Sequence, residues 1–138
     1  MTLLPGPAVS LLAGAAVALA TVTAPLAHAD RPIPPPPPYI DHTRWYSHPS
    51  SLHVYPTAAG RVASTQFVSP DHAWREVLAD APDADTAGMR AQFVCHWQFA
   101  EAADPGKVSW NLEPWRPVVD SATMIETRCN PGAPEEPE

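Results

Sequence analysis

Alternating apolar and polar side chains predict a β-hairpin in the middle of the chain. Residues 51–55, SLHVY, place leucine and valine on one face and histidine and tyrosine on the other, which is the pattern of a half-buried strand. Pro56 and Gly60 bracket a short turn, so residues 61–68, RVASTQFV, are predicted as the partner strand. Residues 39–50 show no period and are predicted to form an irregular entry segment.

A helical period begins directly after this region. Ser69 is a good helix cap, Pro70 suits the first helical position, and Asp71 lies at the positive end of the helix dipole. The apolar residues that follow recur at helical spacing and fall on one face: Ala73, Trp74, Val77, Leu78 and Ala81. Pro82 ends the pattern, so we predict a helix between these two prolines.

The stretch from Met89 to Phe99, MRAQFVCHWQF, fits two periods. Read with a period of two, its apolar side chains alternate as in a strand; read with the helical period, a helix capped by Asp85 or Thr86 has an apolar face. We predict a short helix to about Cys95 that continues as an extended segment.

The remaining segments are predicted as strands separated by turns. Residues 104–106, Asp-Pro-Gly, are predicted as a turn, residues 107–112 as a strand, and residues 118–125 as a last strand. Together the elements predict a small α+β fold, a twisted antiparallel sheet with one or two helices packed on one face.

The beginning of the chain has the pattern of a signal peptide. An apolar run over residues 11–23 is too short to cross a bilayer, and residues 27–29, Ala-His-Ala, match a small-x-small cleavage site. We therefore predict residues 1–29 to be a signal peptide cleaved near Ala29. The mature chain is expected to be secreted, either extracellular or associated with the cell envelope, and no later apolar run is long enough for a membrane span.

Composition divides the mature chain into three parts. Residues 30–38 are proline-rich and are predicted as a stiff polyproline II spacer. Residues 39–131 are predicted as a single globular domain, whose small core gives a thin stability margin. Residues 132–138 are acidic and too polar to pack, so we predict a disordered tail.

The net charge of −7 limits the classes of partner. A protein that coats DNA or RNA needs a basic stripe that displaces counterions, so the charge argues against a nucleic-acid coating role. The sequence has neither a phosphate-cradling glycine loop nor a calcium loop, and we expect no cofactor. We also expect a monomer.

The chain has two cysteines, Cys95 and Cys129, so a single pairing exists. Export into an oxidising compartment favours a disulfide between them. Closing a loop of this length stabilises a small domain by about 4 kcal/mol in the chain-entropy model. A nucleophilic Cys95 beside His96 is the alternative, but neighbouring side chains on a helix or a strand point apart.

Several strings along the chain carry a family resemblance. SLHVYPTAAGR, AWREVL, GMRAQFVCH, KVSWNLEPWRP and CNPG, in that order, resemble a family of secreted proteins of high-GC Gram-positive bacteria that is defined by a domain of unknown function. The match spans Trp45 to Gly132, and QFVCH and WNLEPWRP are its most specific pieces. The resemblance implies export and a disulfide, and it assigns no chemistry. It marks nine motif positions: Gln92, Cys95, His96, Trp110, Asn111, Glu113, Trp115, Arg116 and Cys129.

The segment WNLEPWRP, residues 110–117, is the main candidate for a binding surface. Two prolines stiffen it, and aromatic faces beside amide, acidic and basic groups are suited to a sugar or a peptide terminus. The candidate binding residues are Trp110, Asn111, Glu113, Trp115 and Arg116. In the alternative interpretation, Trp110 belongs to the core and Glu113 forms a structural ion pair with Arg116.

Two weaker constellations involve histidines. His96, with His53 and either Glu113 or Glu76, could serve as the acid–base set of a metal-independent phosphodiesterase or ribonuclease. His72 and Glu76 lie one helical turn apart and could hold a metal from two sides. The sequence specifies no third ligand, so we predict a solvated pair and no metal site.

The sequence therefore predicts a small, secreted, disulfide-bridged domain of unknown function that binds a polysaccharide or a protein in or outside the cell envelope. The alternative is a small secreted hydrolase that acts through His96 and a carboxylate. An enzyme is the less favoured of the two interpretations.

Overall fold

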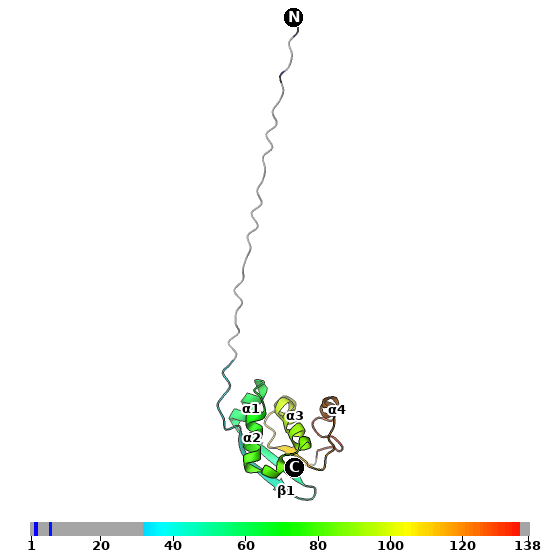
Figure 1. Ribbon diagram of the computed structural model, residues 1–138. Coiled ribbons are helices and arrows are strands. Elements are labelled where there is room, and N and C mark those ends of the chain that lie inside the picture. Colours follow the sequence, from blue (N-terminus) through cyan, green and yellow to red (C-terminus); the bar gives the residue numbers. More distant parts are fainter. Residues whose placement is uncertain (1, 3–5, 7–31, 136–138) are drawn as a thin grey trace. The chain divides into compact units, whose positions relative to one another are not determined.

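Three strands form an antiparallel sheet in the order β1-β2-β3 in the computed structural model, which describes residues 2, 6 and 32–135 (Figure 1). The strands are β1 (Ile40–Tyr46), β2 (Ser51–Pro56) and β3 (Trp110–Leu112). In the described residues the helices are α1 (Ala58–Thr65), α2 (Asp71–Asp80), the 3-10 helix η1 (Pro82–Ala84), α3 (Ala87–Ala103) and α4 (Ser121–Glu126). This small sheet with helices and one disulfide confirms the predicted α+β class.

The hairpin consists of β1 and β2, which corrects the predicted entry segment. Tyr46 pairs with Ser51 and Thr43 with Val54, so residues 39–50 contain a strand. The burial of β1 explains the error, because Ile40 is the one buried residue of that strand. An exposed strand carries no apolar alternation that a sequence could reveal.

Helix α1 replaces the partner strand that was predicted over residues 61–68. Thr57 caps the helix, and its Oγ1 accepts a hydrogen bond from the Gly60 N–H at 2.9 Å. A Cβ at Gly60 would lie 2.1 Å from the carbonyl oxygen of Tyr39, so the close approach of the two segments requires glycine. The helix buries small residues, and such a face gives a weak hydrophobic signal.

Helix α2 confirms the predicted helix and also supports β1, but the predicted Ser69 cap is wrong, because Pro70 takes the cap position and the helix begins at Asp71. Its apolar face packs into the core. Oε2 of Glu76 accepts hydrogen bonds from the backbone N–H groups of Tyr39 and Ile40, each at 2.7 Å. Asp80 accepts from the Thr43 N–H at 2.6 Å, and the hydrogen bonds from Thr43 lower the pKa of Asp80. Acidic side chains of α2 therefore satisfy backbone donors of β1.

Helix α3 is continuous over 17 residues, so the extended segment predicted after Cys95 is wrong. Thr86 caps it by accepting a hydrogen bond from the Met89 N–H at 3.2 Å. Met89, Phe93 and Trp97 enter the main core, whereas Cys95 belongs to a second cluster beside α4. Burial on more than one side explains why two periods fit this stretch.

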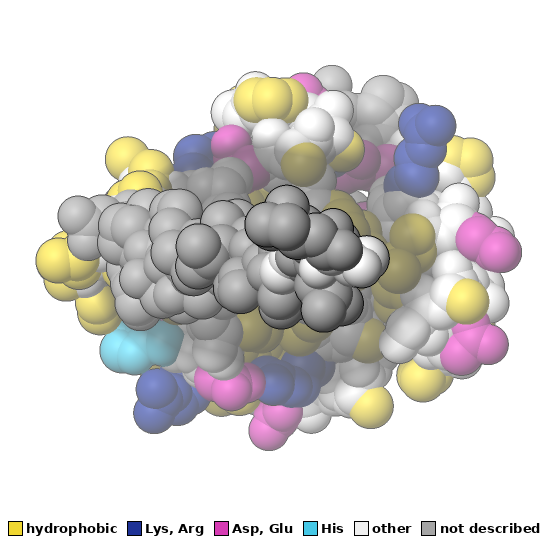
Figure 2. Space-filling view, turned by 90° about the horizontal axis from the view of Figure 1, so that it is seen from above, with side chains coloured by type: hydrophobic (Ala, Val, Ile, Leu, Met, Phe, Trp, Pro, Cys, Tyr) yellow, Lys and Arg dark blue, Asp and Glu magenta, His cyan; other side chains and the backbone are white. Residues whose placement is uncertain are grey.

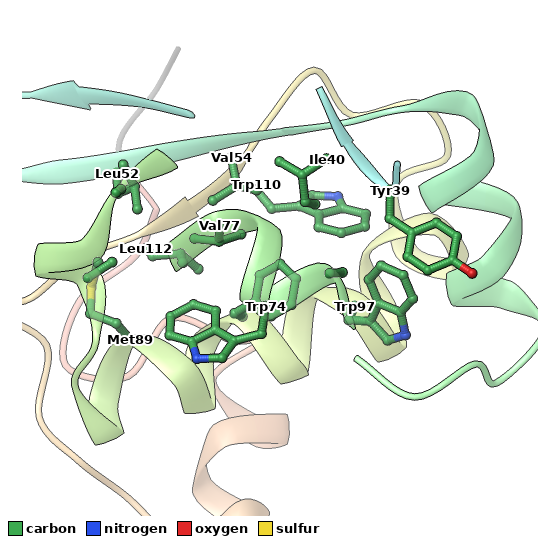
Figure 3. Packing of buried hydrophobic residues seen from close by; sticks show 14 of the residues in the cluster. Tyr39, Ile40, Leu52, Val54, Trp74, Val77, Met89, Trp97, Trp110 and Leu112 are labelled. Atoms are coloured by element: carbon green, nitrogen blue, oxygen red, sulfur yellow. The ribbon is translucent and has the colours of Figure 1, made fainter. Parts of the chain in front are cut away.

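Aromatic rings dominate the main core, which lies between the sheet and the helices (Figure 3). Trp74 packs on Phe93 with ring centroids 5.3 Å apart, and Trp97 meets Trp110 edge-on at 6.1 Å. Trp97 also donates its indole N–H to the carbonyl of Val68 at 2.8 Å. Three of the five tryptophans thus hold the helices against the sheet.

The strand predicted over residues 118–125 is also wrong, because helix α4 occupies most of it. Asp120 caps this helix, and its carboxylate accepts a hydrogen bond from the Thr123 N–H at 2.8 Å. Met124 is the one buried residue of α4, so little apolar period marks the helix. The strand predicted over residues 107–112 is present in shorter form as β3.

The predicted disulfide between Cys95 and Cys129 is confirmed, with an S–S distance of 2.03 Å. It joins α3 to the segment that follows α4, and Met124 packs beside it in the second buried cluster. The bridge therefore ties the central helix to the end of the folded region.

The two ends of the chain are described in part. The predicted signal peptide, residues 1–29, lies outside the described residues except for positions 2 and 6, and spacer residues 32–38 contain no helix or strand. Residues 132–135, which were predicted as a disordered tail, contact Arg116 and Lys107. Residues 136–138 lie outside the described part of the chain.

Charges of both signs lie close together on the surface. Figure 2 shows acidic and basic side chains interspersed around the periphery of one face. Arg90 pairs with Asp71 at 2.6 Å, and Arg61 pairs with Glu101. Among the described residues, no helix has both the length and the apolar character needed to cross a membrane.

We predict that reduction of the disulfide strongly destabilises the domain. The bridge spans 34 residues, so its loss costs about 4 kcal/mol in the chain-entropy model. For a domain of this size the loss corresponds to a fall of roughly 15–30 °C in melting temperature. Thermal unfolding followed by circular dichroism, with and without dithiothreitol, measures the change.

The Cys95→Ala/Cys129→Ala variant is the control for this measurement. It has no bridge to reduce, so it should melt at the same low temperature in both buffers. An unchanged melting temperature of the reduced wild type would contradict a stabilising role for the bridge.

Candidate functional site

The 110–117 segment lies mostly inside the protein. Four of its five candidate binding residues are between 0% and 3% exposed: Trp110, Asn111, Glu113 and Arg116. Trp115 is 41% exposed, and the guanidinium carbon of Arg116 lies 4.5 Å from the centre of its ring. In this arrangement Trp115 alone among the five presents a large surface to solvent, which differs from the contact loop that the sequence predicted.

Glu113 and Arg116 form a buried ion pair, as in the alternative interpretation of this segment. Oε2 of Glu113 accepts a hydrogen bond from Nε of Arg116 at 2.6 Å, and Ser51 donates to Oε1 at 3.4 Å. Arg116 also donates to backbone carbonyls, including that of Pro131 at 3.2 Å. These bonds satisfy both charges, so the pair fixes the loop without an uncompensated buried charge.

Polar side chains of α3 occupy the outer edge of β3. Gln92 donates its amide N–H to the carbonyl of Glu113 at 3.0 Å and accepts from the Glu113 N–H at 2.9 Å. Nε2 of His96 lies 3.1 Å from the carbonyl oxygen of Asn111. Gln92 and His96 are four residues apart, so both project from the same side of the helix. The QFVCH string therefore provides the hydrogen bonds that a fourth strand would supply.

His96 is buried, and its surroundings decide its protonation. The pKa of His96 is lowered to about 4, mainly by burial; the charge of Glu135 and the hydrogen bond with Asn111 oppose this shift, and the charges of Lys107 and Arg116 add to it. At neutral pH the imidazole is uncharged, and the tautomer with a proton on Nε2 donates to the Asn111 carbonyl. This is the role of a structural histidine bonded to the backbone.

The structure separates the members of the predicted acid–base set. His53 and Glu113 line one cleft, whereas His96 lines a different pocket beside the disulfide. The predicted combination of His96 with His53 and Glu113 is therefore not assembled in a common cleft.

His72 and Glu76 form a hydrogen-bonded pair on α2. Nε2 of His72 lies 3.1 Å from Oε1 of Glu76. The other oxygen of Glu76 accepts from the backbone of β1. Within the described residues, no group of three or more histidine, cysteine or acidic side chains is placed to hold a metal ion. Glu76 thus has a structural role that its spacing from His72 does not predict.

The face of the sheet turned away from the main core carries a cluster of rings. His42 stacks on Tyr55 with ring centroids 4.2 Å apart, and Tyr46 lies 4.3 Å from His53. The guanidinium carbon of Arg44 lies 5.1 Å from the centre of the Tyr46 ring. Alternate residues of a strand point to the same face, which brings these side chains from β1 and β2 together. We call this set of five residues the open sheet face.

A cleft of about 440 Å³ lies at one end of the open sheet face. Its wall includes the rings of Tyr46, His53 and Tyr55. Its floor is made of buried polar side chains, of which Ser109 is 1% and Asn111 is 3% exposed. The floor also includes Ser51 and Glu113. A ligand in this cleft would meet aromatic surface on one side and hydrogen-bonding groups below.

The polar floor is connected by hydrogen bonds. Oγ of Ser109 donates to Oδ1 of Asn111 at 2.6 Å and lies 3.3 Å from Nδ1 of His53. The sequence does not predict this cleft, because it does not predict β1 as a strand. Thr43 and Trp45, which lie between His42, Arg44 and Tyr46, are also polar and aromatic, so no alternation marks the face that carries the cleft.

The fold and the cleft define a small disulfide-bridged α+β domain with a ligand-sized site on one side of its sheet. The comparison with known families agrees with the resemblance seen in the sequence. The chain belongs to the family described as "Protein of unknown function (DUF2599)", whose model matches residues 40–132.

Relatives of the chain occur in mycobacteria. It is 59% identical over 107 residues to "Uncharacterized protein Rv0477" of Mycobacterium tuberculosis (strain ATCC 25618 / H37Rv), covering 75% of this chain and 72% of that protein. It is 48% identical over 102 residues to "Uncharacterized protein ML2452" of Mycobacterium leprae (strain TN), covering 71% of this chain and 83% of that protein. An uncharacterised domain family of high-GC bacteria is therefore confirmed. No solved structure matches the chain.

We predict that His96 makes the stability of the domain depend on pH. Its pKa is about 4 in the folded protein and near 6.5 in an unfolded chain, so the unfolded state takes up the proton first as the pH falls. The contribution is fully present above about pH 6.5 and is lost toward about pH 4, by about 3 kcal/mol in total. Urea unfolding at about pH 7, 5.5 and 4.5 measures this loss.

A His96→Gln variant tests the assignment, because its amide retains a donor for the Asn111 carbonyl. Between about pH 6.5 and 4 the free energy of unfolding should fall less in the variant than in the wild type, and the difference between the two falls should be about 3 kcal/mol. His42→Gln, which changes an exposed histidine, should behave as the wild type. Equal pH dependence in wild type and His96→Gln would rule out His96 as the cause.

The buried ion pair generates a second stability prediction. Arg116→Met leaves the Glu113 carboxylate buried without its partner, so the free energy of unfolding should fall by about 3–5 kcal/mol. Arg90→Met removes a partner from the exposed pair with Asp71 and should cost less than about 1 kcal/mol. Denaturant unfolding compares the two variants, and a loss below about 1 kcal/mol for Arg116→Met would show that the pair is dispensable.

Proposed function

We propose that the protein is an exported binding module that holds a polysaccharide of the cell envelope in the cleft beside the open sheet face. The observation that carries the proposal is the construction of that cleft, with an aromatic wall over a buried polar floor. Sugar rings have apolar C–H faces and hydroxyl edges, so they require both kinds of surface at once.

Export is the first step of the proposal. The apolar run over residues 11–23 and the Ala-His-Ala site at residues 27–29 have the features of a signal peptide. The disulfide supports the same conclusion, because structural disulfides persist mainly in oxidising compartments outside the cytosol. We therefore place the working site of the protein outside the cytosol, in or beyond the envelope.

The residues in the wall of the cleft support the proposal of a sugar ligand. Tyr46 is 39% exposed, so part of its ring is accessible to a ligand. The hydroxyls of Tyr46 and Tyr55 lie 3.4 Å apart, which places two groups that can donate or accept near the same point. Rings fixed in this way stack on a ligand at small entropic cost, because their side chains are already ordered.

The residues in the floor of the cleft favour a binding role over a catalytic one. Glu113 is the one acidic residue in the lining of this cleft. Both of its carboxylate oxygens already accept hydrogen bonds, from Arg116 and from Ser51. Its position is thus fixed by contacts inside the protein. We therefore propose a binding role in preference to the hydrolase.

We predict that removing one ring of the wall weakens polysaccharide binding without unfolding the domain. Tyr46→Ala in the chain of residues 30–138 should lower the affinity for an insoluble cell-wall polysaccharide fraction about tenfold, since a stacked ring contributes about 1.4 kcal/mol. The melting temperature should change by only a few degrees, because the side chain is partly exposed. Co-sedimentation with increasing amounts of the fraction measures the binding.

Two matched variants sharpen this experiment. Phe67→Ala removes a ring that is 95% exposed and does not line the cleft, so its binding should equal that of the wild type. Trp115→Ala tests the loop surface that the sequence predicted. If Trp115→Ala abolishes retention while Tyr46→Ala does not, the contact surface is the loop and the cleft proposal is wrong. Retention that is lost on protease treatment of the fraction but survives glycan digestion would identify a protein ligand instead.

A further inference from the structure

The C-terminal segment is bound to the domain through its backbone. The guanidinium of Arg116, a residue that is 3% exposed, donates to the carbonyls of Pro131, Ala133 and Pro134. Gly132 has φ +93°, a conformation that favours glycine, and it allows the chain to turn against Pro117. Three carbonyls thus share one buried cation, which is a way to hold an extended peptide with little dependence on its side chains.

One side chain of this segment lines a second pocket. The Glu135 carboxylate pairs with Nζ of Lys107, and their side chains are 26% and 15% exposed. The pocket has a volume of about 450 Å³ and lies beside the disulfide, separate from the cleft of the open sheet face. His96 and Arg128 also line it. Glu135 therefore forms part of the wall of this pocket, where it pairs with another wall residue, Lys107.

The charge around this pocket is unusual for an acidic chain. The net charge of the protein is −7, yet Lys107 and Arg128 line this pocket, and Arg116 bonds the carbonyl of Pro134, which also lines it. Asp104 and Glu135 are the acidic residues of the lining. Without Glu135 the pocket would keep a partly buried ammonium group that lacks this partner, which is costly.

We propose that Arg116, Lys107 and the pocket beside them form a binding site for an extended acidic peptide, and that residues 133–135 are its resident, exchangeable ligand. The backbone bonds to Arg116 position the peptide, and the ion pair with Lys107 selects an acidic side chain directly after proline. Release of the resident segment breaks its carbonyl bonds to Arg116 and its ion pair with Lys107, and an incoming acidic peptide would form the same bonds again. A partner protein with an acidic, proline-containing segment would compete for the same site.

The test uses a fluorescent peptide with the sequence of residues 132–138, Gly-Ala-Pro-Glu-Glu-Pro-Glu. Fluorescence polarisation measures its binding to the chain of residues 30–138. In a Glu135→Gln/Glu136→Gln variant the resident segment can no longer form the ion pair, so the added peptide should bind at least about tenfold more tightly than to the wild type. A peptide in which glutamines replace the glutamates should not bind either chain.

Two further variants identify the site. Adding Lys107→Met to the double-glutamine variant should abolish peptide binding, whereas adding Arg90→Met should leave it unchanged, since Arg90 lies in a different pair. Polysaccharide retention should persist in the Lys107→Met chain, so the two sites fail independently. Absence of saturable binding to the double-glutamine variant would overturn the proposal. Equal binding of the acidic and the glutamine peptide would also overturn it. The comparison of the two peptides uses unchanged protein, so it does not depend on the folding of any lysine variant.

Discussion

The structure depends on the contact between α3 and the free edge of β3. A three-stranded sheet leaves this edge with backbone donors and acceptors that need partners inside the protein. Gln92 supplies one donor and one acceptor to Glu113, and His96 bonds the Asn111 carbonyl. Each buried group left without a partner would cost about 1–3 kcal/mol. The helix therefore takes the place of a further strand, and the sheet stays narrow.

This contact also determines where a ligand site can form. The helices cover one face of the sheet, so the rings of β1 and β2 on the other face remain available. The backbones of Asn111 and Glu113 form hydrogen bonds with side chains of α3, and the same two residues form part of the cleft floor. The floor is thus held by the same bonds that hold the fold. A site built in this way is preorganised, which lowers the entropic cost of binding.

Sequence patterns revealed the elements with a strong periodic or covalent signal, namely the helix α2, the strand β2 and the bridge between Cys95 and Cys129. The patterns failed for elements that do not have a single buried face. Strand β1 is almost wholly exposed, α3 is buried on more than one side, and α4 buries Met124 alone. The 110–117 loop shows a further limit. A glutamate and an arginine three residues apart give the same sequence pattern whether they are exposed to solvent or form a buried ion pair. Which of the two occurs depends on the tertiary environment.

The two pockets differ in charge, and this difference separates the ligands that we propose for them. In the cleft of the open sheet face, the one carboxylate of the lining is neutralised from within by Arg116. Its hydroxyl, amide and ring groups therefore offer hydrogen bonds and stacking without net charge, which matches a neutral sugar. In the pocket beside the disulfide, Lys107 is partly buried, and a carboxylate satisfies it. Arg116 links the two environments, since one guanidinium neutralises Glu113 and also bonds the peptide that lies next to the second pocket.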